Sequence, residues 1–362
     1  MTKKFLGLVV LLLMGILVLS GCGSKTAPAQ QEGAGSGSST EKVSTEKSLK
    51  KFNVGYLPAP GHALYFVAKE KGYFQEQGLN VEMFQFTNSG EGLNALKAGK
   101  IDVGSFGTAA PLTFISKGAE FTLFGGQQSE GAGIVTKPER ADQFKDLNNF
   151  KGKTVATVRL ATGDVVFRGA LQQAGIDWKK DLKVQELDSP AAVLEAVNKG
   201  SVDAGIVWAP YMKMAEKRGL KIVKYSGELF KAHTCCRQAA LTSKIKENPD
   251  DYKRFLKALI KAYDFYQNNK TESVDIIAKY VKIDKDIIEA ETYGGHISSN
   301  PDPNKEGIVK FWELMNKAGY ISSDKKITDY INTDLYTQAL DEMLKEAPNN
   351  QTYAKLKSDF KP

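Results

Sequence analysis

Histidine and cysteine are scarce in this chain, with three of each among 362 residues. So few cysteines argue against a framework of disulfides. Charge of one sign is not abundant either, because 49 Lys and Arg face 42 Asp and Glu. The basic residues alternate with acidic ones along predicted helices, which is typical of a solvated surface. We therefore expect no nucleic-acid partner.

Long apolar runs are limited to the N-terminus. Lys3 and Lys4 precede an almost unbroken apolar run from residue 5 to 19, and Leu-Ser-Gly-Cys follows and ends at Cys22. This order predicts a secretory signal peptide over residues 1–21, with an uncleaved anchor as the alternative. The run is shorter than the ~20 residues that span a bilayer.

The residues before Cys22 resemble the lipobox of bacterial lipoproteins. This resemblance implies that palmitate or a similar acyl chain modifies Cys22 and holds the protein on the extracytoplasmic side of the cell membrane. Residues 22–50 are then a tether. The stretch from 23 to 48 is rich in Gly, Ser, Thr, Ala, Gln, Lys and Glu and has no aromatic residue. Such a composition cannot offset the entropy of ordering, so we expect flexibility.

The remaining residues, 51–362, are enough for two domains of ~100–200 residues each. Segments such as "KFNVGYL" and "IDVGSFG" predict strands, and "HALYFVAKEKGYF" and "GEGLNALKAGK" predict helices between them. The same alternation resumes at Lys153, and the chain becomes mainly helical after Leu241. Alternation of this kind predicts α/β domains with largely parallel sheets.

An internal similarity links the two halves. "LNALKAGKIDVGSFGTAAP" in the first half matches "LEAVNKGSVDAGIVWAP" in the second. Each stretch has a helix, then a strand that begins at Asp, then Ala-Pro before the next helix. The match predicts a duplicated unit and two similar lobes, although βα repeats can share such Asp and Ala-Pro positions by chance.

Residues 72–118, "GYFQEQGLNVEMFQFTNSGEGLNALKAGKIDVGSFGTAAPLTFISKG", resemble the nitrate/sulfonate/taurine and thiamine-precursor branch of ABC-importer solute-binding proteins. The second-lobe stretch "VDAGIVWAPY" matches the same branch. The resemblance implies a two-lobe periplasmic-binding-protein fold of type II, with two hinge crossings and a helical C-terminal part. It also implies a monomer without a cofactor that clamps a small solute and delivers it to a membrane permease and its ATPase.

Two similar segments mark the expected crossings between the lobes. "GAGIVTKP" and "RQAALTSK" are short apolar strands that close in Thr or Ser and then Lys. We place the hinge at 131–137 and 238–244, where two chain crossings permit bending. Lobe I would then comprise residues 51–134 and 239–362, and lobe II residues 135–238.

Ligand contacts in such folds come from loops after strand ends, where helix N-termini present unpaired N–H groups. Any single loop could be an ordinary βα turn, but the set as a whole favours a binding cleft. The candidate ligand-binding residues are His62, Ser89, Gly107, Thr108, Gln128, Thr162, Gly163, Asp164, Trp208, His233, Cys235 and Arg237.

Arg237 and the helix N-termini favour an anionic solute such as a sulfonate. Asp164 argues the other way, because a carboxylate would attract an amine. We therefore expect a small organic solute with an anionic or zwitterionic, sulfonate-like head. A thiamine-pyrimidine precursor and a metal-associated ligand held through His and Cys remain alternatives.

The segment "HTCCRQ" leaves several chemistries open. In an extended strand, alternation would point His233, Cys235 and Arg237 into the cleft and Cys236 away from it. The thiols could be plain wall residues, weak metal ligands together with His62 and His233, or a strained vicinal disulfide. The segment also loosely resembles the eukaryotic thiamine-pyrimidine synthase, but secretion argues against an enzyme.

Overall fold

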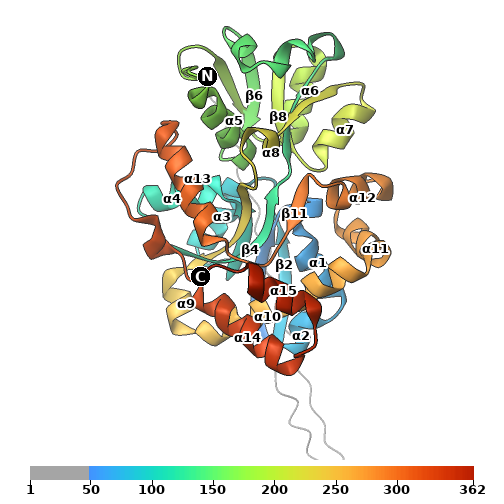
Figure 1. The fold of residues 1–362 in the computed structure, drawn as a ribbon, viewed down its shortest axis with the longest axis vertical. Helices are drawn as coiled ribbons and strands as arrows, with labels where there is room; N and C mark the ends of the chain where they lie inside the picture. The colour runs from blue at the N-terminus through green and yellow to red at the C-terminus, as the bar shows by residue number, and fades with distance from the viewer. Residues whose placement is uncertain (1–48) are drawn as a thin grey trace, which may run out of the picture. The chain divides into compact units, whose positions relative to one another are not determined.

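The computed structural model describes residues 49–362, so the predicted signal peptide, Cys22 and nearly all of the tether lie outside the described residues. Two β-sheets organise this part of the chain (Figure 1). We call the six-stranded sheet with its helices lobe I and the five-stranded sheet with its helices lobe II. The strand orders are β11-β4-β10-β3-β1-β2 and β7-β6-β8-β5-β9.

The strands of lobe I are β1 (Lys50–Tyr56), β2 (Leu79–Gln85), β3 (Val103–Gly107), β4 (Phe121–Glu130), β10 (Thr234–Leu241) and β11 (Ile297–Ser299). Those of lobe II are β5 (Ala132–Thr136), β6 (Thr154–Val158), β7 (Lys183–Leu187), β8 (Ala204–Trp208) and β9 (Lys221–Tyr225).

Both sheets are mixed, whereas the sequence predicted largely parallel ones. β1 pairs in parallel with β2 and β3, and β6 with β7 and β8. The strands that arrive from the other lobe, β5 and β10, are antiparallel to their neighbours. Each of these two strands starts at the end of the sheet where the parallel strands finish. It must therefore run in the direction opposite to them.

The helices between the strands are α1 (Ala63–Glu70), α2 (Tyr73–Glu76), α3 (Ser89–Lys97) and α4 (Ala109–Ser116) in lobe I, and α5 (Thr162–Gln173), α6 (Pro190–Lys199), α7 (Tyr211–Lys217) and α8 (Ser226–Leu229) in lobe II. The C-terminal helices are α9 (Thr242–Glu247), α10 (Pro249–Asn268), α11 (Lys270–Tyr280), α12 (Lys285–Tyr293), α13 (Lys305–Lys317), α14 (Asp334–Glu346) and α15 (Gln351–Asp359). The expected two-lobe α/β fold with a helical C-terminal part is confirmed.

The two matching sequence stretches occupy equivalent places. In lobe I, Asp102 accepts a hydrogen bond from the backbone N–H of Asn53 at 2.7 Å, just before β3. In lobe II, Asp203 accepts one from the backbone N–H of Thr154 at 2.8 Å, just before β8. Each aspartate thereby fastens the start of one parallel strand to its neighbour, which is consistent with a duplicated unit.

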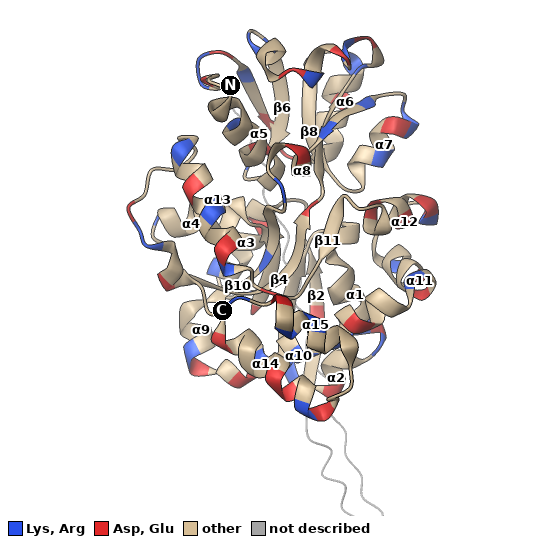
Figure 2. Cartoon of the chain, in the orientation of Figure 1, with Lys and Arg blue, Asp and Glu red and all other residues tan. Residues whose placement is uncertain are grey.

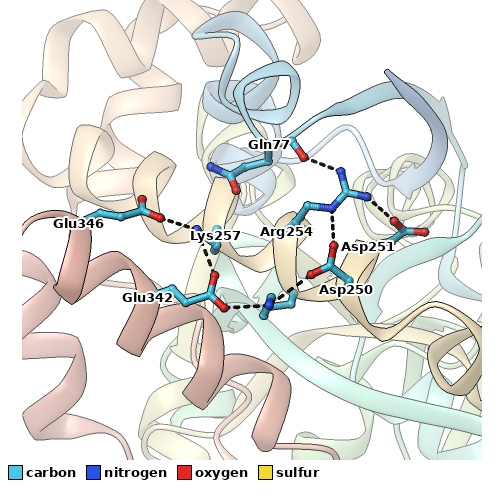
Figure 3. Close-up of polar contacts among 8 residues, drawn as sticks. Gln77, Asp250, Asp251, Arg254, Lys257, Glu342 and Glu346 are labelled. Atoms are coloured by element: carbon cyan, nitrogen blue, oxygen red, sulfur yellow. Dashed lines mark hydrogen bonds and ion pairs between the residues drawn. The ribbon is translucent and has the colours of Figure 1, made fainter. Parts of the chain in front are cut away.

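Helix α10 connects the C-terminal helices to lobe I. Its buried face packs Phe255 against the rings of Phe52 and Phe74, with centroids 5.4 and 5.5 Å away. Its outer face carries the ion-pair network of Figure 3, in which Lys257 binds Glu346 of α14 at 2.6 Å. Arg254 donates to the backbone oxygen of Gln77 at 2.7 Å and so reaches the end of α2.

Charged residues of both signs lie side by side on the outer helices (Figure 2). Most of their ion pairs are exposed, as between Lys253 and Glu342 at 2.7 Å or Lys279 and Glu70. Exposed pairs of this kind contribute little to stability, typically ~0–1 kcal/mol each. The outer charges therefore serve solubility, and the site must be sought among buried groups.

The chain passes between the lobes earlier than the sequence suggested. The first crossing lies between the ends of β4 at Glu130 and β5 at Ala132, with Gly131 at φ 89°. The second runs from Tyr225 through α8 to Thr234. All of β5 pairs within lobe II and all of β10 within lobe I, so 132–137 and 238–244 are strand and helix, not linkers. The lobe boundaries predicted at 134/135 and 238/239 fall inside β5 and β10, and each of these strands pairs within one sheet.

Candidate functional site

A small pocket lies where the two sheets face each other. Its volume is about 40 Å³. Segments that follow β1, β3, β6 and β8 contribute to it, as expected for the carboxyl ends of parallel strands. The lining residues are Leu57, Ala59, His62, Gly107, Gln128, Gly131, Ala132, Thr162, Gly163, Trp208, Ala209, Cys235 and Cys236.

The structure brings seven of the twelve predicted ligand-binding residues to this pocket. They are His62, Gly107, Gln128, Thr162, Gly163, Trp208 and Cys235. The other five lie behind the wall: Ser89, Thr108, Asp164, His233 and Arg237.

Glycines allow close approaches around the pocket, one between the lobes and two within a lobe. A Cβ atom at Gly107 would lie 2.8 Å from Thr162 Oγ1 in the other lobe, and one at Gly163 would lie 2.6 Å from the Ala132 Cβ. A Cβ at Gly61 would overlap the Gln128 side chain. These close approaches position the start of α5 against β3 and keep the pocket small.

His62 presents the clearest unsatisfied polar group. Its side chain is 1% exposed, and its Nδ1 has no hydrogen-bond partner among the described residues. Burial lowers the pKa of His62 to about 3, because the charged imidazolium would lose its hydration. His62 is therefore neutral at ordinary pH and offers one N–H donor and one nitrogen acceptor to a ligand.

The first residues of α5, Thr162 and Gly163, supply a second polar surface. No side chain caps this twelve-residue helix, so its first N–H groups are available to an acceptor in the pocket. Gln128 adds an amide whose Nε2 donates to the Glu130 backbone oxygen at 3.2 Å. Leu57 and Trp208 contribute apolar walls.

Asp164 faces away from the pocket although it lies in the first turn of α5. Its carboxylate forms an ion pair with Arg168 at 2.7 Å, and Arg168 also reaches Glu186 at 3.2 Å. Burial raises the pKa of Asp164, and the guanidinium of Arg168 opposes this rise. The carboxylate is thus neutralised inside lobe II, and the expected attraction for an amine in the pocket is not supported.

Arg237 also turns away from the pocket. It is 2% exposed and donates to the backbone oxygens of Gln128 and Cys236, both at 2.8 Å, and to Ser129 Oγ at 3.3 Å. His233 lies with its ring between Phe230 and Phe311, each centroid 6.3 Å away. The orientation predicted for these two side chains is therefore wrong.

A β-bulge explains why simple alternation failed. On the partner strand β4, Ser129 lies opposite Thr234 and Gln128 lies opposite Cys236. Cys235 is the extra residue between them, and such a residue shifts the side chains that follow onto the other face. Cys235 and Cys236 consequently both line the pocket, with their sulfur atoms 3.7 Å apart.

Two further predicted residues hold the wall in place. Ser89 Oγ accepts a hydrogen bond from the backbone N–H of Gly107 at 3.3 Å. Thr108 donates through both its backbone N–H and its hydroxyl to the backbone oxygen of Cys235. Both residues support lining residues from behind and do not contact the pocket.

Among residues 49–362, no group of three or more His, Cys, Asp or Glu side chains is arranged to hold a metal ion. Of the four weak candidates, His233 does not line the pocket, and its ring packs against Phe230 and Phe311. Neither is any helix of the described part long and apolar enough to cross a membrane.

Sequence reasoning missed several wall residues: Leu57, Ala59, Gly131, Ala132, Ala209 and Cys236. Most are small or apolar, and nothing in their chemistry distinguishes them from core residues. Position offered the only signal, since Ala209 stands in the repeated Ala-Pro motif.

The chain belongs to the NMT1-like family, whose model matches residues 45–282. It is 27% identical over 309 residues to an aliphatic sulfonates-binding protein of Bacillus subtilis, covering 83% of this chain and 84% of that protein. It is also 26% identical over 241 residues to the 4-amino-5-hydroxymethyl-2-methylpyrimidine phosphate synthase of Saccharomyces cerevisiae, covering 62% of this chain and 68% of that one.

The crystal structure of SsuA, the periplasmic aliphatic sulphonate binding protein of Escherichia coli, has the same fold. It superposes with a TM-score of 0.67 at 21% identity and covers 80% of this chain and 99% of that one. The chain therefore has the type II periplasmic-binding-protein fold that its sequence predicted.

Proposed function

We propose that this protein is the extracytoplasmic solute-binding component of an ABC importer, which clamps one small solute between its lobes and delivers it to a permease and ATPase. The observation that carries this proposal is the pocket lined from both lobes, with neutral His62 in its wall and the Nδ1 of His62 unpartnered among the described residues. A buried polar atom without a partner costs free energy unless a ligand or water satisfies it.

We further propose a small sulfonate-like solute. Among the described residues, the pocket wall carries no Arg or Lys, so neutral donors must hold the head group. The uncapped start of α5, Gln128 and His62 can donate to the oxygens of an anion, and a helix N-terminus favours negative charge. Leu57 and Trp208 would contact the organic part. The family membership and the sulfonate-binding relatives support this class.

Binding without turnover is part of the proposal. The yeast relative is named a synthase, so a pyrimidine-precursor ligand is the alternative. Isothermal titration of methanesulfonate, ethanesulfonate, taurine and nitrate, with an aminopyrimidine as comparison, decides the class. We expect a sulfonate to bind and to be recovered unchanged by mass spectrometry. Binding of the aminopyrimidine alone, or a new product, would contradict the proposal.

A matched pair of variants connects binding to the pocket. His62→Ala removes the unpartnered ring and should weaken sulfonate binding at least tenfold. His296→Ala is the control, because His296 does not line the pocket and stacks on Tyr225. Equal affinity in the two variants would place the solute elsewhere.

The anchor at Cys22 is a separate proposal, made from the sequence alone. Cys22→Ser should release the protein into the medium or leave an unprocessed precursor, because the acylated thiol is lost. Fractionation of producing cells with an immunoblot provides the readout. Normal processing and membrane retention of the variant would contradict lipidation at this residue.

A further inference from the structure

Two thiols meet in the wall of the pocket, which is unusual for neighbours in a strand. Side chains of consecutive strand residues normally point to opposite faces. Here the bulge at Cys235 brings both Cys235 and Cys236 to the pocket, with 3.7 Å between the sulfur atoms. Both are free thiols in this structure.

The two cysteines differ in access and in acidity. Cys235 is partly exposed, whereas Cys236 is 5% exposed. The hydrogen bond from Cys236 and the nearby Arg237 lower the pKa of Cys235, while the same contact and burial raise the pKa of Cys236. The thiolate is the reactive form of cysteine. Attack on an external reagent would therefore begin at Cys235, with Cys236 beside it as the second thiol.

We propose that Cys235 and Cys236 form a reversible redox site in the pocket wall, oxidised to a vicinal disulfide by a small soluble disulfide. The Cys235 thiolate attacks one sulfur of this oxidant, a mixed disulfide forms, and the first small thiolate leaves. Cys236 then loses its proton and attacks Cys235 Sγ, and the second small thiolate leaves. Two protein thiols and one small disulfide become one protein disulfide and two small thiols, so atoms and electrons balance.

Geometry makes this disulfide easy to reduce again. Neighbouring Cα atoms lie ~3.8 Å apart, below the ~4.4–6.8 Å usual for a disulfide, so the bridge is strained. Strained disulfides have more oxidising potentials and belong to the labile class. The couple can therefore respond to changing redox conditions outside the cytoplasm.

Oxidation would alter the pocket itself. The sulfur atoms must approach from 3.7 Å to a bond of ~2.05 Å, and two S–H donors disappear. In a cavity of about 40 Å³, such a shift changes the contact with any solute. This consequence for solute binding rests on the proposed function, whereas the chemistry of the thiols does not.

The first experiment tests the chemistry alone. The full chain carrying Cys22→Ser, which leaves only Cys235 and Cys236, is treated with oxidised glutathione. We expect an intact mass lower by two hydrogens, a peptide map that joins the two residues, and reversal by reduced glutathione. Cys236→Ser should keep glutathione on Cys235, and Cys235→Ser should react much more slowly. Two stable glutathione adducts on the parent, or no reaction, would overturn the proposal.

The second experiment measures ethanesulfonate affinity by titration calorimetry of the reduced and oxidised protein. We expect the oxidised form to bind at least tenfold more weakly. Equal affinities would show that the couple does not control the site and would overturn that part of the proposal. Should neither form bind ethanesulfonate, taurine or nitrate, the proposed function fails, and the mass result still decides the redox site.

Discussion

Two arginines are buried among residues 49–362, one in each lobe, and their surroundings differ. Arg168 in lobe II is 4% exposed and binds the carboxylates of Asp164 and Glu186, with its guanidinium 4.2 Å above the Trp178 ring. Arg237 in lobe I is 2% exposed and binds backbone oxygens and a hydroxyl.

The pKa values of the two arginines express the difference. Burial acts to lower the pKa of Arg168, but Asp164, Tyr320 and Glu186 together raise it above its ordinary value. Burial dominates at Arg237 and lowers its pKa to about 10, although Asp302 acts against the change. A buried cation is thus held by countercharge in one lobe and by dipoles in the other. Neither arginine lines the pocket.

Breaking the ion pair between Arg168 and Asp164 should have the largest effect on the free energy of unfolding. Arg168→Met leaves Asp164 buried without its cation, and removing one partner of a buried ion pair typically costs ~3–5 kcal/mol. Urea unfolding followed by circular dichroism measures this loss. Arg159→Met is the matched control, because Arg159 contacts the same Glu186 at 3.1 Å from an exposed position. We expect it to cost less than ~1 kcal/mol.

A double variant sharpens the first prediction. In Arg168→Met with Asp164→Asn, the carboxylate is gone together with its partner, so part of the lost stability should return. Equal stability of the single and double variants would show that the arginine acts by packing on Trp178 and Tyr320, not by its charge.

A buried carboxylate extends the comparison to the opposite charge. Glu291 on α12 is 1% exposed and accepts a hydrogen bond from the backbone N–H of Lys213 on α7 at 3.1 Å. Burial raises the pKa of Glu291 from its ordinary 4.5 to about 7. The folded protein therefore binds a proton more tightly than the unfolded chain does. The contribution of Glu291 to stability should fall as the pH rises through the window between these two values, by ~3 kcal/mol at 1.36 kcal/mol per pKa unit. The lowered pKa values of buried His62 and His233 act in the opposite direction, so the Glu291 contribution is read from the difference between wild type and a Glu291 variant.

Glu291→Gln should remove this pH dependence, because an amide does not ionise. Thermal or urea unfolding between pH 4.5 and 8 measures the effect. Glu289→Gln on the same helix is the control, since Glu289 is exposed and pairs with Lys270 at 2.7 Å. A difference between the wild-type and Glu291→Gln stabilities that stays constant over this range would contradict the burial argument.

Replacing Arg237, which is held by backbone oxygens, should have the smallest of these effects on the free energy of unfolding. Arg237→Met leaves backbone oxygens of Gln128 and Cys236 without their donor, which costs ~1–3 kcal/mol. Ethanesulfonate affinity should change less than threefold, because Arg237 does not line the pocket. Titration calorimetry checks this after the fold has been verified. A tenfold or larger loss of affinity in a folded variant would restore Arg237 as the partner of the head group.

The sequence alone determined the order of helices and strands in this protein. Apolar periodicity and Gly or Pro punctuation identified the α/β repeats, the C-terminal helices and the loops that carry His62, Thr162 and Trp208. These features could be predicted because each arises from contacts among residues close in the chain. The family resemblance then placed the loops at one cleft.

Only the tertiary structure decided where the polar side chains of β10 and α5 point. The bulge at Cys235 arises from pairing with β4, more than a hundred residues earlier, and it reverses the predicted faces of Cys236 and Arg237. Asp164 turns inward because Arg168 forms an ion pair with it there. Alternation along a strand assumes a regular ladder, and a single extra residue in a long-range pairing is enough to break that assumption.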